Sequence, residues 1–130
     1  MSSAVAILIE SDGEVTTPGF AGLTKPGHPG GPLWHVRVLI DSAVPEGMAV
    51  PRSADLVVWT DGHAHYHRRT SNLLGSVVVA DAFELLLQDV CGPVLVTGDT
   101  VKAPRALVST GLIEAFEFLG LEPVGAHIEG

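Results

Sequence analysis

The sequence predicts an α/β (α+β) fold, with a single mixed β-sheet of about five to seven strands and two helices packed on it. Two observations lead to this prediction. The first half of the chain holds short apolar, β-prone runs separated by turn residues, so the N-terminal half is expected to be strand-rich. The second half alternates segments of helical periodicity with apolar runs, an order in which helices pack against a sheet.

Composition favours one folded domain over residues 1–130. Apolar residues make up 46% of the chain and charged residues only 17%, which excludes a disordered protein. The formal net charge of -8 argues against nucleic acid as a partner, because nucleic-acid binding depends on clustered cationic side chains. The same charge suits a protein partner with a basic surface, or solubility alone. A homo-oligomer is left open.

Cys91 is the only cysteine, so the chain can form neither an internal disulfide nor a cysteine-based zinc site of its own. Its apolar neighbourhood predicts a buried, inert thiol. The N-terminus lacks the pattern of a secretory signal, and no segment has the 18 or so apolar residues of a membrane span. We therefore expect a cytoplasmic protein.

Apolar runs predict strands at residues 4–10, 15–17, 33–40, 93–97 and 121–128. Residues 18–32 hold five glycines and four prolines and predict a loop, as do residues 41–54. One helix is expected from an N-cap in Thr70-Ser71-Asn72 to about Val90, although a short strand at 77–79 is left open. Its apolar stripe would be Val79, Ala82, Phe83, Leu86, Leu87 and Val90.

A second helix is expected to open at Pro104, after a turn at Gly98-Asp99-Thr100. Its apolar stripe would be Leu112, Ile113, Phe116 and Leu119, and Gly120 would end it.

The clearest local signal is a hairpin over residues 55–68. Asp61-Gly62 stands between two β-prone runs and suits a two-residue type I′ turn. Period-two alternation then places one set of side chains against the core and the other set away from it. The core set is Val57, Trp59, Ala64 and Tyr66, and the outer set includes His63, His65 and His67.

The three histidines His63, His65 and His67 alternate along one strand, so their imidazoles would line one face. Such a row could bind zinc or another transition metal if a further ligand approached it. His35, His127, Asp41 or Asp99 could supply that ligand. The alternative is a polar face of the hairpin exposed to solvent.

Asp41 and Asp99 each directly follow a predicted strand, where open α/β sheets place their ligand sites. Two carboxylates converging there could hold Mg²⁺ or Mn²⁺ and act as catalytic metal ligands. The alternative is that each aspartate begins a turn.

From Val36 to about Thr100, the order of elements resembles the ribonuclease H-like fold. The resemblance rests on a strand ending at Asp41, the hairpin over 56–68, Asn72 at the entry to a helix, and VLVTGDT at the end of the next strand, which contains Asp99. It implies a metal-dependent phosphodiesterase with Asp41 and Asp99 as ligands. Gly75 stands where that family has a helix glutamate, a departure from its catalytic pattern.

The chain also resembles small uncharacterised proteins carried by phages and conjugative plasmids, through the segments AVAILIESDGEV, DLVVWTDGHAHYH and GPVLVTGD. This resemblance implies an accessory protein of a mobile element. The sequence leaves open whether the protein is an enzyme. Our leading hypothesis is a non-catalytic binding or regulatory module that acts through a protein partner. The alternatives are the ribonuclease H-like enzyme and a histidine-rich site for a transition metal.

Overall fold

A computed structural model describes residues 4–20, 33–51, 56–63, 68–99, 104–107 and 109–121 of the chain. The strands are β1 (Ile7–Ile9), β2 (Val15–Thr16), β3 (Pro45–Ala49), β4 (Leu56–Asp61), β5 (Val94–Asp99) and β6 (Pro104–Arg105). The helices are α1 (Trp34–Leu39), α2 (Leu73–Phe83) and α3 (Ser109–Leu119). None of the helices in these ranges is long and apolar enough to span a membrane.

The strands form one sheet in the order β2-β1-β5-β4-β3, and β6 pairs with β5. The predicted fold class, a single sheet with helices packed on it, is therefore confirmed. Each pairing between these strands is antiparallel, and a third helix joins the two that were expected.

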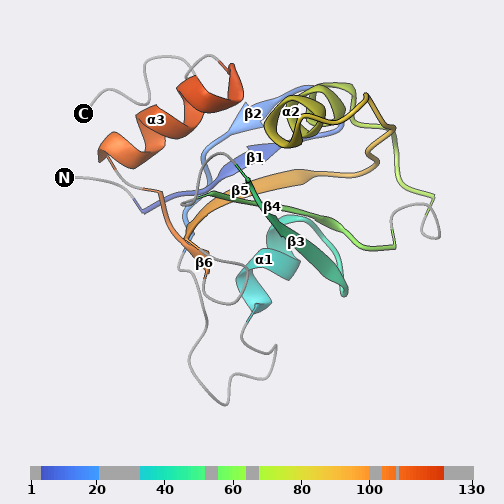
Figure 1. Ribbon diagram of the computed structural model, residues 1–130. Coiled ribbons are helices and arrows are strands. Elements are labelled where there is room, and N and C mark those ends of the chain that lie inside the picture. Colours follow the sequence, from blue (N-terminus) through green and yellow to red (C-terminus); the bar gives the residue numbers. More distant parts are fainter. Residues whose placement is uncertain are drawn as a thin grey trace.

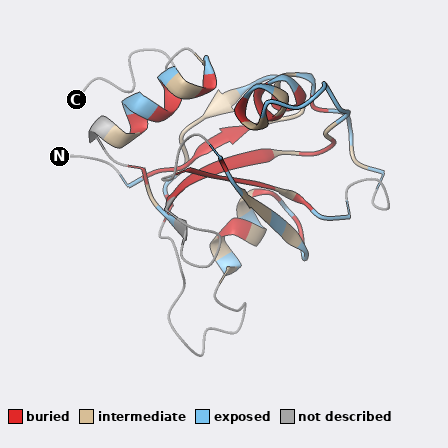
Figure 2. Cartoon of the chain, in the orientation of Figure 1, coloured by how far each residue is buried: buried red, intermediate tan, exposed pale blue. Residues whose placement is uncertain are grey.

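The sheet lies between two apolar layers, with α2 and α3 on one face and α1 on the other (Figure 1). Alternate residues of β4 point to opposite faces, so Val58 packs beneath α2 and α3 whereas Val57 and Trp59 pack towards α1. Because both faces are covered, the central strands are buried along most of their length (Figure 2). The predicted core position of Trp59 is confirmed, and its indole N–H donates to Thr97 Oγ1 at 2.9 Å.

The prediction of a strand at 33–40 is wrong, because these residues form α1 and the turn after it. Val36 and Ile40 lie four residues apart, on one side of a helix, and both are fully buried. They pack against the sheet face that carries Val57 and Trp59. Burial of this pair therefore outweighs the β-propensity of the segment.

The loop predicted at 41–54 is also wrong in part, because it contains β3. Pro45 is tolerated as the first residue of a strand at the end of the described sheet. Gly47 lies opposite Trp59, and a Cβ atom at Gly47 would stand 2.7 Å from the indole ring. The absence of a side chain there lets Trp59 lie across β3.

The predicted hairpin does not form, because both edges of β4 are already paired. Val58 lies between Met48 of β3 and Val96 of β5, so these two strands take both of its edges. Asp61, expected in the turn, is the last residue of β4. Residues 64–67, with Tyr66, His65 and His67, lie outside the described part of the chain.

The predicted N-cap is confirmed, because the Asn72 side chain accepts the Gly75 N–H. Residues 77–79 are helical, which settles the alternative of a strand there. The helix ends at Phe83 rather than near Val90, and Glu84 turns the chain with a φ of 53°. The chain returns because Val90 bonds to the start of α2, accepting the Asn72 N–H and donating to Ser76 Oγ.

The strand predicted at 93–97 is confirmed as β5, which continues through Gly98 and Asp99 where a turn was expected. Pro104 begins β6 and not a helix, since Gly98 pairs with Arg105. The predicted stripe lies in α3, where Leu112, Phe116 and Leu119 are buried but Ile113 is exposed. Gly120 follows α3 with the expected positive φ, and residues 122–128 lie outside the described ranges.

Candidate functional site

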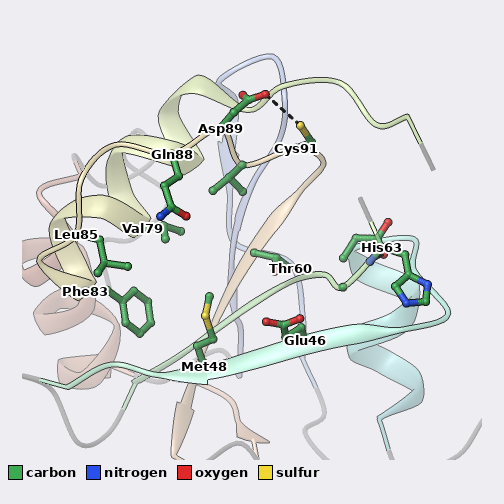
Figure 3. Close-up of a pocket in the computed structure, with 13 residues that line it drawn as sticks. Glu46, Met48, Thr60, His63, Val79, Phe83, Leu85, Gln88, Asp89 and Cys91 are labelled. Atoms are coloured by element: carbon green, nitrogen blue, oxygen red, sulfur yellow. Dashed lines mark hydrogen bonds between the residues drawn. The ribbon is translucent and has the colours of Figure 1, made fainter. Parts of the chain in front are cut away.

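A groove of about 470 Å³ lies between strands β3 and β4 and the segment that follows α2 (Figure 3). Glu46 and Met48 of β3 and Thr60 of β4 form its floor, because the pairing register puts them on the face that carries Val58. The end of α2, Leu85 and residues 88–91 form its wall. The groove exists because α2 stops at Phe83 and leaves β3 uncovered.

The groove is apolar at one end and polar at the other. Met48, Phe83 and Leu85 gather at the apolar end, and Glu46 lies between them and His63 (Figure 3). The polar residues that line it are Glu46, Thr60, Asp61, His63, Gln88 and Asp89. No lysine or arginine is among the residues that line the groove in the described part of the chain. The groove therefore offers apolar surface beside carboxylates.

Cys91 lies at the top of the groove, close to Asp89. Its thiol donates to Asp89 Oδ2 over 3.5 Å, and Ser71 Oγ donates to the same oxygen over 3.2 Å. Burial, followed by the hydrogen bond to Asp89, raises the pKa of the Cys91 thiol. A thiol held protonated is a poor nucleophile. This agrees with the buried, inert thiol that the sequence predicted.

Asp61 has a buried carboxylate that is fully engaged with its neighbours. Oδ1 accepts the Ser42 hydroxyl at 2.8 Å and the His63 backbone N–H at 3.0 Å. Oδ2 accepts the Arg69 guanidinium at 3.2 Å. Arg69 also donates to the carbonyl groups of Ile40 and Asp41, so the cluster joins the end of α1 to the end of β4. The cluster around Asp61 therefore has a structural role.

The structure does not bring Asp41 and Asp99 together. The Asp41 backbone is joined through Arg69 to Asp61, at the C-terminal end of β4. Asp99 follows Gly98, which lies opposite Leu56 at the N-terminal end of β4. Five residues separate Leu56 from Asp61, a distance of about 17 Å along a strand. The backbones of the two aspartates therefore lie near opposite ends of β4.

Two of the histidines considered for the metal site fall within the described ranges. His63 lines the polar end of the groove, and His35 on α1 stacks against Phe20 with ring centroids 5.4 Å apart. Across the described ranges, no cluster of three or more histidine, cysteine, aspartate or glutamate side chains could hold a metal. His65, His67 and His127 lie outside those ranges, so the triplet itself stays a prediction.

The groove is bordered by apolar side chains exposed to solvent. Leu86 is 88% exposed, Leu87 62% and Leu85 54%. The prediction that Leu86 and Leu87 belong to a buried helical stripe is therefore wrong. A second, shallower hollow brings Leu85 and Leu87 together with Val77 of α2. Three consecutive exposed leucines next to a groove are typical of a surface that binds another molecule.

Sequence reasoning missed the groove because its two sides come from distant segments. Glu46 and Met48 lie in a stretch expected to be a loop, and Gln88 and Asp89 in a stretch expected to be a helix. The one local signal of this surface is the run Leu85-Leu86-Leu87, because three consecutive leucines exposed to solvent indicate a binding surface.

Comparisons of the chain with protein families, with curated proteins and with solved structures give no match.

Proposed function

We propose that this protein is a non-catalytic binding module that holds a segment of a partner protein in the groove between β3 and the end of α2. The observation that supports this most directly is the groove itself, which combines apolar surface with the carboxylates of Glu46 and Asp89. The exposed run Leu85-Leu86-Leu87 extends the apolar surface beyond it. Desolvating such leucines on a partner is a common source of affinity.

The charge of the molecule indicates what kind of partner fits. The chain carries a formal net charge of -8, and the groove lining within the described ranges has no lysine or arginine. A partner segment with lysine or arginine next to an apolar side chain would complement both properties. Complementary charge raises the association rate and selects against acidic partners.

The groove chemistry also supports a binding role rather than a catalytic one. The Cys91 thiol is held protonated, and the Asp61 carboxylate is occupied by Ser42, His63 and Arg69. Following the resemblance to phage and plasmid proteins, we place the module in the cytoplasm as an accessory protein of a mobile element.

The test is selection from a phage-displayed library of random peptides of about ten residues, the upper length of a typical strand. We expect selected peptides to combine Lys or Arg with Leu, Met or Phe. Binding should fall about tenfold or more in Glu46→Lys, as expected when a charge pair is replaced by like charges. It should stay unchanged in Glu117→Lys, which makes the same charge change on the exposed face of α3.

Raising the salt concentration should weaken this binding, because part of the attraction is electrostatic. Selection that enriches no peptide, or peptides that bind wild type and Glu46→Lys equally, would refute the proposed function. Circular dichroism and thermal unfolding of each variant check that the fold is intact.

A further inference from the structure

We infer that the partner segment binds as an extended strand, added antiparallel to the outer edge of β3, with alternate side chains directed into the groove. This inference rests on the proposed function and specifies how the groove is used. It concerns the backbone of β3, in addition to the side chains that line the groove.

Backbone hydrogen bonds from β3 to β4 occur at alternate residues, and this alternation shows which backbone groups of β3 face outwards. The Val50 N–H donates to the Leu56 carbonyl, and the Gly62 N–H donates to the Val44 carbonyl. Residues of this strand therefore bond to β4 at every second position, from 44 to 50. The N–H and C=O groups of Gly47 and Ala49 point the other way, towards the outer edge.

That outer edge has no neighbouring strand within the described part of the chain, where β3 is the last strand in the sheet order. Unpaired N–H and C=O groups at a strand edge are a template for another strand. Gly47 and Ala49 carry little or no side chain, so a partner backbone can come close. Pro45 has no N–H to offer, which limits the pairing to a short segment.

The same alternation of hydrogen bonds determines where the side chains of an added strand would lie. In antiparallel pairing on the outer edge, Gly47 and Ala49 occupy hydrogen-bonded positions. Glu46 and Met48 occupy the non-hydrogen-bonded positions that alternate with them. Facing Cα atoms are closest at non-hydrogen-bonded positions, about 4.5 Å apart. Two partner side chains would therefore lie directly beside Glu46 and Met48, on the groove face.

Charge and polarity specify these two side chains. A lysine or arginine suits the position beside Glu46, and an apolar side chain suits the position beside Met48 and Phe83. The two positions are two residues apart on the partner. Because the strands run antiparallel, the apolar residue comes first, giving the order apolar, any residue, basic. A parallel strand would require the reverse order.

The experiment uses peptides selected from the phage library and the full chain. We expect the apolar-x-basic order among the selected peptides. N-methylation of the peptide amides that face β3 should weaken binding about tenfold, because each loses a hydrogen bond and gains a clash. N-methylation of the alternate amides should have little effect.

On the protein, Ala49→Pro should weaken binding about five- to tenfold, because it removes an outward donor while leaving the bonds to β4 in place. Ala49→Ser, which keeps that N–H and stays small, is the matched comparison and should bind about fivefold or more tightly than Ala49→Pro.

Three results would overturn the inference. Binding insensitive to N-methylation at every position, but lost in Glu46→Lys, would mean that the groove binds its partner without strand addition and would leave the proposed function intact. A dominant basic-x-apolar order would refute the antiparallel direction. A homodimer that Ala49→Pro dissociates, measured by light scattering, would show that a second copy of the chain occupies the edge.

Discussion

Asn72 provides the sharpest test of how the fold is held together. Its side chain is fully buried and makes three hydrogen bonds. Oδ1 accepts the Gly75 N–H at 2.8 Å, and Nδ2 donates to the carbonyls of Ile9 and Gly92, both at 2.9 Å. One residue thus joins the start of α2 to the end of β1 and to the segment that enters β5.

Replacing Asn72 by alanine removes all three bonds. Loss of an N-cap costs about 1 kcal/mol, and each lost bond to a buried carbonyl about another 1 kcal/mol. We expect Asn72→Ala to lower the free energy of unfolding by about 3 kcal/mol. In urea the unfolding midpoint should fall by between about 1 and 3 M, given the slopes usual for small proteins. Fluorescence of the buried Trp59 and far-ultraviolet circular dichroism both report the transition.

Asn72→Asp separates the two roles of this side chain. It keeps the acceptor for Gly75 but replaces the two donated bonds by an oxygen that faces two carbonyl oxygens. We expect it to destabilise the fold at neutral pH at least as much as alanine does. Val77→Ala, at an exposed position on the same helix, is the control and should stay within about 0.5 kcal/mol of wild type. An Asn72→Asp variant as stable as wild type would show that only the cap matters and would refute the argument.

Three further predictions concern other positions. Gly47→Ala should destabilise the fold by about 1 to 3 kcal/mol and shift the fluorescence of Trp59, because the new methyl group meets the indole ring; a neutral effect would contradict this packing. Cys91 should react with iodoacetamide more slowly than an unfolded control at pH 8, since its raised pKa keeps the thiol protonated. Folding favours the neutral thiol of Cys91, so this side chain contributes stability below its ordinary pKa and loses that contribution as the pH rises through the raised pKa of the folded protein. Above pH 9, the free energy of unfolding should therefore fall more steeply with pH in wild type than in Cys91→Ala. Leu86→Gln should leave the unfolding midpoint unchanged because the side chain is 88% exposed, while weakening peptide binding; a marked loss of stability would mean that Leu86 is buried in solution.

Several features of this fold follow from short stretches of sequence. Asn72 caps α2 because an amide oxygen at that position meets the free N–H groups of the first turn, whatever lies around it. Gly120 ends α3 because glycine accepts a positive φ at little cost. The apolar run of β5 and the buried position of Trp59 are similarly local in origin, since large apolar side chains must leave water.

The end of α2 is determined by the need of the chain to return to the start of the helix. No local signal in the sequence predicts this end. Val90 must bond to Asn72 and Ser76 at the start of the helix. The eleven residues of α2 span about 16 Å, and the residues after Phe83 need an extended path of similar length to come back. A helix running to Val90 would leave that residue at the far end. The leucines at 85–87 are exposed as a result, and the groove opens beside them.

Strand pairing decided the rest, and pairing depends on segments far apart in the chain. The run 55–68 has a good local turn at Asp61-Gly62, but β5 takes one edge of β4 from more than thirty residues away, and β3 takes the other. With both edges filled, the hairpin cannot form. Helix caps, buried apolar runs and the fold class can be predicted from the sequence, because they depend on near neighbours and on burial. Which strands pair depends on contacts between distant segments, because hydrogen bonding along an edge admits only one partner. This pairing is why Glu46, Met48 and Phe83 line one groove.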